Sequence, residues 1–168
     1  MSYSPSNLFL ATGNSRQRKL DLGLLGENCV CKFLAAANWK ILHQRWRCTR
    51  GEIDIIAWRN ETPDSPEQQA NLRFVEVKTR SSGSWDAGGL LAITPEKQAK
   101  LLQAAQMFLA SRPDLADLPC QFDVALVSCR RSRQKKQASV EAIGLGKPVL
   151  MGEYQLTLDQ YIEGAFSF

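Results

Sequence analysis

Two stretches, GEIDIIAWRN at residues 51–60 and LRFVEVKTR at residues 72–80, decide the fold of this chain. Each is rich in β-branched residues and carries charged residues at alternate positions, which is typical of a strand. The polar segment between them contains two prolines, so we expect the two strands to pair as a hairpin. Since side chains alternate between the faces of a strand, Glu76 and Lys78 share one face, and a suitable register brings Asp54 beside Glu76.

These two carboxylates and one amine form a candidate metal site. Mg²⁺ prefers oxygen ligands and is commonly held by one or two carboxylates together with a substrate phosphate. A lysine beside them could orient a nucleophilic water or offset charge on a phosphoryl group. The alternative is a solvated hairpin face, and the spacing alone favours that alternative. However, Ile56 and Phe74 lie on the same face as the charges, which predicts that this face is at least partly covered.

Composition predicts one globular domain with a core of its own. The chain has 168 residues, of which 44% are hydrophobic, and a net charge of +4 that is compatible with nucleic-acid binding. Its five cysteines include no C-x-x-C pair, so we expect reduced thiols and a cytoplasmic protein. No apolar run approaches the ~18–20 residues of a membrane span, and no signal peptide is expected. We expect a flexible arm at residues 1–15 and the folded domain at residues 16–168.

The periodicity of the whole chain predicts an α/β fold with a mixed sheet flanked by helices. The expected elements, in chain order, are a helix at 16–38, a strand at 39–48, the two hairpin strands, a helix at 95–111, a strand at 120–129, a strand at 139–143 and a helix at 158–166. Thr94 is the expected N-cap of the second helix, with proline at the first helical position. The strand at 120–129 is apolar at almost every position and is therefore expected to be central.

Glu27 stands on the apolar face of the first predicted helix, between Leu24 and Leu34. A carboxylate on a face that packs against a sheet is costly unless it is paired, hydrogen-bonded or bound to metal. One explanation is that Glu27 belongs to the metal site. The other is that the helix is loose near Gly23 and Gly26, and that Glu27 reaches a backbone amide or an arginine. The residues by themselves leave both explanations open.

Several basic residues are candidates for nucleic-acid contacts, each with a plain alternative. The arginines around Trp46 could grip phosphates beside a stacked base, or form a solvated strand edge. Lys97 borders the apolar face of its helix and could reach a phosphate, or simply hold its ammonium in water. The tract RRSRQKK at residues 130–136 could bind nucleic acid, although most such tracts are solvated loops. The candidates are Arg45, Arg47, Arg50, Arg80, Lys97, Arg130, Arg131 and Arg133.

Two further polar residues are expected to be structural. His43 is the only histidine of the chain, which excludes His-rich zinc sites and two-histidine acid–base schemes. Asp123 interrupts the apolar strand and could be a further acidic ligand. A buried aspartate bonded to backbone or to an arginine is the favoured interpretation.

Together these motifs resemble a known superfamily of nucleases. A helical glutamate at position 27, then G-E-I-D with Asp54, then E-V-K with Glu76 and Lys78 is similar to the PD-(D/E)xK pattern. That superfamily has a restriction-endonuclease-like αβββαβ core. Over residues 20–129, the segments GEIDIIA, FVEVKTR and FDV resemble more closely the YraN family, small bacterial proteins usually described as endonuclease-related. This family is similar in fold to archaeal Holliday junction resolvases.

The resemblance implies an Mg²⁺-dependent DNA endonuclease acting on branched or single-stranded DNA, with Mn²⁺ as a substitute metal. It implies that Asp54, Glu76 and the backbone carbonyl of Val77 bind the metal. Lys78 orients the nucleophile, and Glu27 faces the site. Junction resolvases work as dimers, so a homodimer is one expected assembly.

Departures from the family pattern leave the substrate open, among them the Asn-Cys-Val-Cys that follows Glu27 and the long polar loop at residues 61–71. Ile53 replaces the superfamily's proline, and Arg45 stands where asparagine is usual. Because fold similarity does not establish activity, two other functions remain open. One is a nucleic-acid-binding or complex-assembly protein that keeps the nuclease fold without turnover. The other is a structural or protein-interaction domain.

Overall fold

The computed structural model describes residues 15–60, 70–81, 93–133 and 143–167, with side-chain environments from residue 21 onward. In these ranges the elements are α1 Ser15–Ala36, β1 Lys40–Cys48, β2 Gly51–Arg59, β3 Asn71–Arg80, α2 Pro95–Ser111, β4 Cys120–Arg131, β5 Pro148–Met151 and β6 Tyr154–Phe166. The first six follow the expected order of helix, three strands, helix and strand. The α/β class with a mixed sheet and this αβββαβ core is therefore confirmed.

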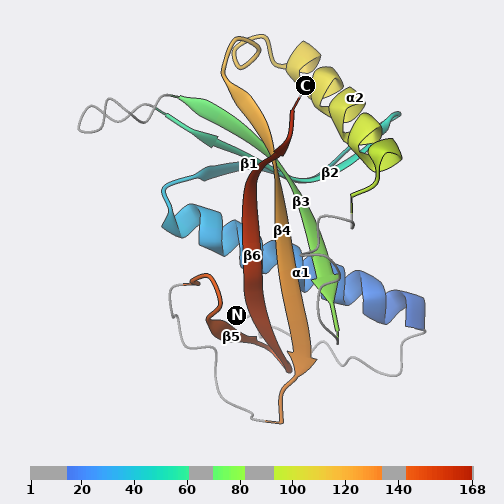
Figure 1. Ribbon diagram of the computed structural model, residues 1–168, viewed down its shortest axis with the longest axis vertical. Helices are drawn as coiled ribbons and strands as arrows, with labels where there is room; N and C mark the ends of the chain where they lie inside the picture. The colour runs from blue at the N-terminus through green and yellow to red at the C-terminus, as the bar shows by residue number, and fades with distance from the viewer. Residues whose placement is uncertain (1–14, 61–69, 82–92, 134–142, 168) are drawn as a thin grey trace, which may run out of the picture.

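The described strands form one sheet in the order β1-β2-β3-β4-β6-β5 (Figure 1). Strands β3 and β4 run parallel, and every other neighbouring pair is antiparallel. As predicted, β4 is central and buried over most of its length. Helix α1 packs on the sheet face that includes Val75 and Val127, and α2 packs on the face that includes Ile56 and Phe74. The face that carries the candidate charges is therefore covered by α2, as Ile56 and Phe74 predicted.

Helix α2 begins and ends where its local sequence predicts. The Thr94 side chain accepts a hydrogen bond from the Lys97 backbone N–H, and Pro95 occupies the first turn. Leu101, Ala105 and Phe108 are buried against the sheet. These positions recur at helical spacing, so one face of α2 is apolar and the opposite face carries polar side chains to solvent.

Helix α1 is continuous, and its buried face differs in part from the predicted one. Leu34 is buried, but Leu24 is 40% exposed because Gly26 and Glu27, rather than Leu24, face the sheet. A Cβ atom on Gly26 would lie 1.9 Å from Oγ1 of Thr79 in β3. The expectation that this glycine loosens the helix is therefore wrong. Its missing side chain instead lets α1 approach β3 closely.

The C-terminal expectations need correction. Residues 158–166 were expected to form a helix, but they belong to β6, which pairs with β4 along most of its length. Leu156 and Leu158 alternate with more exposed neighbours, and pairing with a central strand outweighs local helix propensity. The expected strand at 139–143 lies outside the described residues except for Ile143, which is not in a strand.

Two further expectations concern the chain as a whole. Residues 1–14 of the expected arm lie outside the described residues, and Ser15 already begins α1. All five cysteines are free thiols, as expected. Of the helices in the described ranges, none combines the length and the apolar character of a membrane-spanning segment.

Candidate functional site

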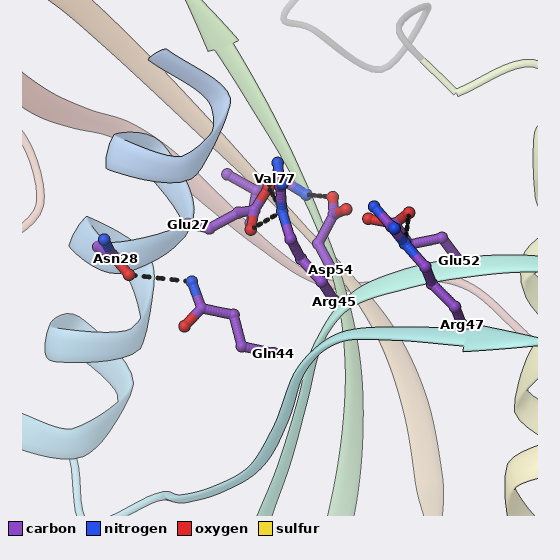
Figure 2. Close-up of polar contacts among 8 residues, drawn as sticks. All are labelled: Glu27, Asn28, Gln44, Arg45, Arg47, Glu52, Asp54 and Val77. Carbon is purple, nitrogen blue, oxygen red and sulfur yellow. Dashed lines mark hydrogen bonds and ion pairs between the residues drawn. The ribbon is translucent and has the colours of Figure 1, made fainter. Parts of the chain in front are cut away.

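The candidate site lies where β2 and β3 part. Their pairing runs from Arg59 opposite Asn71 to Ile55 opposite Val75. One residue further along β2, Oδ2 of Asp54 accepts a hydrogen bond of 2.8 Å from the backbone N–H of Val77 (Figure 2). The Asp54 carboxylate therefore accepts a hydrogen bond that a backbone carbonyl of β2 would accept if the strand pairing continued.

Glu76 lies next to this point and is 3% exposed. Its Oε1 atom contacts Nζ of Lys78 at 2.7 Å and Nζ of Lys97 at 3.2 Å. Its Oε2 atom is buried and has no hydrogen-bond partner in the described part of the chain. The structure thus brings Lys97 of α2 to the same carboxylate as Lys78, which sequence spacing alone could not show.

The two carboxylates affect each other electrostatically. Burial and the nearby charge of Glu76 raise the pKa of Asp54 to about 7, and the charge of Glu27 also raises it. The hydrogen bond from the Val77 N–H and the charge of Lys97 oppose this rise. Because burial and neighbouring negative charge both disfavour the ionised form, a cation at this position would relieve an unfavourable arrangement.

Glu27 makes an ion pair with Arg45 rather than standing alone. The Arg45 Nε atom lies 2.8 Å from Oε2 and 3.1 Å from Oε1, and Nη2 lies 3.0 Å from Oε1 (Figure 2). The neighbouring pair Asn28 and Gln44 adds a hydrogen bond of 2.9 Å between the same two elements. Of the two explanations for Glu27, pairing with an arginine is therefore observed. The charge of Glu27 still acts on Asp54, so the pair borders the site.

Arg45 adopts an uncommon backbone conformation, with φ of +55°. The register of β1 against β2 shifts between Ile41 and His43, just before this position. A non-glycine residue with positive φ is strained and persists when surrounding contacts hold it. Here the contact is the hydrogen-bonded ion pair between the Arg45 side chain and the buried Glu27 carboxylate.

The residues fit a divalent cation. Among the described residues the Oε2 atom of Glu76 has no hydrogen-bond partner, and the pKa of Asp54 is raised, so both carboxyl groups could accept a cation. The N–H of Val77 faces Asp54, and since the N–H and C=O of one strand residue point to the same side, its carbonyl also faces the gap. In the described ranges no three His, Cys, Asp or Glu side chains form a group that could hold a metal ion. The set that the family resemblance implies consists of two carboxylates and this carbonyl.

The other candidate basic residues lie on several different elements. Arg47 is exposed and pairs with Glu52 at 2.8 Å. Arg50 lies at the β1–β2 turn and lines a groove of about 410 Å³ together with Gln103, Gln106 and Met107 of α2. Arg80 ends β3 beside β4, opposite Ser128. Arg130, Arg131 and Arg133 are exposed, Arg131 pairs with Glu153 at 3.2 Å, and the rest of their tract, residues 134–136, lies outside the described residues.

Asp123 is structural, as expected, whereas the structural role of the exposed His43 stays a prediction. Asp123 is fully buried and accepts hydrogen bonds from Arg73, Gln121, Tyr161 and the backbone N–H of Gly164. The ring of His43 packs edge-on against Phe108. The sequence carried no clear signal for Tyr161, whereas Arg73 shares its face of β3 with the buried Val75, and this spacing could have indicated that it points inward.

Comparison with known proteins places this chain in a family. The model described as "Uncharacterised protein family UPF0102" matches residues 26–127, which include the carboxylates and lysines of the site but not the 130–136 tract. A UPF0102 protein of Trichodesmium erythraeum is 46% identical over 164 residues, covering 89% of this chain and 90% of the relative. Another, from Acaryochloris marina, is 46% identical over 164 residues, covering 92% and 94%. One from Synechocystis sp. is 42% identical over 153 residues, covering 87% and 97%. The chain therefore belongs to the UPF0102 family, which is the YraN group that its motifs resemble.

Proposed function

We propose that this protein is an Mg²⁺-dependent endonuclease that hydrolyses phosphodiester bonds in DNA, with branched or single-stranded DNA as its substrate. The observation that carries the proposal is the buried Glu76, whose Oε2 atom has no hydrogen-bond partner among the described residues and lies beside the Asp54 carboxyl. A solvated hairpin face does not explain this arrangement, because a carboxylate that served only solubility would not be 3% exposed under a helix.

Each residue has a definite role in this proposal. Asp54, Glu76 and the Val77 carbonyl hold the cation, which would offset charge on the phosphoryl oxygens and make the attacking water more acidic. Lys78 projects from the same strand face as Glu76 and holds its ammonium where it can orient that water or neutralise the transition state. Arg45 keeps the Glu27 charge paired, so that this third carboxylate stays ordered next to Asp54.

The direct test is cleavage of labelled linear, single-stranded and four-way-junction DNA in Mg²⁺ and in Mn²⁺. We expect Asp54→Asn and Glu76→Gln each to abolish cleavage, because each removes a charged ligand. The matched control is Glu52→Gln, which changes a carboxylate two residues earlier on β2 that is already paired with the exposed Arg47. We expect this control to cut as the wild type does. Cleavage that survives in both site variants would refute the assignment.

A second function is nucleic-acid binding without turnover. Its support is the set of exposed arginines, namely Arg47, Arg50, Arg130, Arg131 and Arg133. Such binding would weaken steeply with salt, because neutralised phosphates release counterions. Salt-sensitive binding with no cleavage on any of the DNAs, by folded protein, would favour this function over hydrolysis.

A further inference from the structure

Glu76 is shared by two cations from different elements. Lys78 reaches its Oε1 atom from two residues along β3, at 2.7 Å, and Lys97 reaches the same atom from α2, at 3.2 Å. The two lysine side chains are 31% and 34% exposed, whereas that of Glu76 is 3% exposed. One carboxylate therefore holds two ammonium groups, which is one cation more than it can neutralise.

These contacts bear on metal binding because Glu76 is also an expected metal ligand. Two ammonium groups at Oε1 oppose the approach of a dication to the unpartnered Oε2 atom of the same carboxylate. Arg45 already neutralises Glu27, and Asp54 bonds to the Val77 N–H. When all are ionised, three carboxylates thus face three cations, so Lys97 already supplies part of the positive charge that a metal would bring.

Lys97 is the cation better placed to leave. Its contact with Glu76 is longer than that of Lys78, and its stem comes from the helix that covers the site rather than from the strand itself. A third of its side chain is in solvent, so its ammonium can swing to a phosphate bound at the site without moving the backbone. A phosphate would attract it through a charge-assisted hydrogen bond.

We propose that Lys97 moves between Glu76 in the free protein and a phosphate of the bound nucleic acid, so that nucleic acid and divalent metal strengthen each other's binding. This inference rests on the proposed function and adds a role for a residue of α2. In the free protein Lys97 lowers the affinity for metal. With nucleic acid bound, the same residue holds phosphate, and Glu76 regains the charge that attracts a dication. By linkage, metal must raise the affinity for nucleic acid by the same factor.

The first test needs no DNA. Mn²⁺ is titrated into the protein, and the free ion is followed by its electron paramagnetic resonance signal. We expect Lys97→Met to tighten Mn²⁺ binding roughly three- to ten-fold, because a positive charge close to Glu76 is removed. Lys100→Met removes the same charge from an exposed position one turn along α2 and should change the Kd less than about two-fold. Thermal melting verifies folding, and Lys97→Gln replaces Lys97→Met if the latter is unfolded.

The second test measures the coupling. Fluorescence anisotropy gives the affinity for a labelled single-stranded DNA with and without Mn²⁺ at constant ionic strength, with Ca²⁺ in its place wherever a gel shows cut DNA. We expect metal to tighten DNA binding by a several-fold larger factor in the wild type than in Lys97→Met, where only the direct contact between metal and phosphate couples the two. Asp54→Asn measures the effect of metal on the DNA alone.

Either of two results would overturn the inference: Mn²⁺ binding that is unchanged or weaker in Lys97→Met, or wild-type DNA affinity that responds to metal no more than that of Lys97→Met does. Coupling without cleavage would remove the proposed hydrolysis and leave this inference intact. Cleavage without coupling would support the proposed hydrolysis and overturn this inference.

Discussion

Replacing Gly26 with alanine tests how closely α1 must approach the sheet for the site to form. The new Cβ atom would lie 1.9 Å from Oγ1 of Thr79, about 1.5 Å inside ordinary van der Waals contact. Either the Thr79 side chain rotates or the helix moves outward. An outward movement would also displace Glu27, the next residue of α1, from Arg45.

The magnitude follows from two opposing effects. Overpacking a well-filled interior costs about 1–3 kcal/mol, whereas alanine is favoured over glycine inside a helix by up to ~1 kcal/mol. Because the overlap is large, the upper part of the first range, about 2–3 kcal/mol, applies, and subtracting ~1 kcal/mol leaves an expected loss of about 1–2 kcal/mol in the free energy of unfolding of Gly26→Ala. For a chain of this length that corresponds to a melting temperature lower by roughly 2–8 °C.

The chain offers a matched control in the same helix. A Cβ atom on Gly23 would meet only Nη2 of Arg45 at 3.8 Å, which is an ordinary contact. Gly23→Ala should therefore gain about 0.5–1 kcal/mol from helix propensity alone. The two alanine substitutions, three residues apart, are expected to change stability in opposite directions.

Urea unfolding followed by circular dichroism measures both variants, and Thr79→Ala completes a double-mutant cycle. The Thr79 Oγ1 atom is buried and has no hydrogen-bond partner in the part of the chain that the structure describes, so its removal should cost little by itself. In the Thr79→Ala background, Gly26→Ala should recover at least about 1 kcal/mol of its loss. The packing argument fails if Gly26→Ala and Gly23→Ala shift stability alike, or if the cycle shows no coupling.

Two further predictions concern buried carboxyl groups. Because the pKa of Asp54 rises from 3.8 to about 7 on folding, the folded state favours its protonated form. Without divalent metal, the free energy of unfolding should fall by on the order of 2 kcal/mol between pH 5 and pH 8. Asp54→Asn should remove this fall, and urea titrations at both pH values check it; an equal fall in the variant would contradict the argument. Arg73→Met leaves the fully buried Asp123 without the cation at 2.9 Å and should cost roughly 3 kcal/mol. Arg131→Met breaks the exposed ion pair with Glu153 and should lower the free energy of unfolding by less than about 1 kcal/mol. Similar losses of stability in Arg73→Met and Arg131→Met would count against the role of burial.

Much of the fold follows from local sequence. The β-branched runs at residues 51–60 and 72–80 give the hairpin, the Thr94-Pro95 pair gives the start of α2, and the apolar run after Cys120 gives the central strand. Each of these features depends on a periodicity of apolar residues or on a helix cap within one segment, so no distant contact is needed to predict it. The long β6 strand could not be predicted in the same way, because its conformation depends on pairing with β4, far back in the chain.

The same division holds for the candidate site. The sequence by itself determined that Asp54, Glu76 and Lys78 share one face of two neighbouring strands, since side chains alternate along each strand and the register of a hairpin brings the strands together. Only the tertiary structure decided which residues surround them. Lys97 comes from α2, the partner of Glu27 is Arg45, and Gly26 sets the distance between α1 and Thr79. The reason is physical: the period of a strand tells which way a side chain points, whereas the packing of helices on the sheet tells what it meets there.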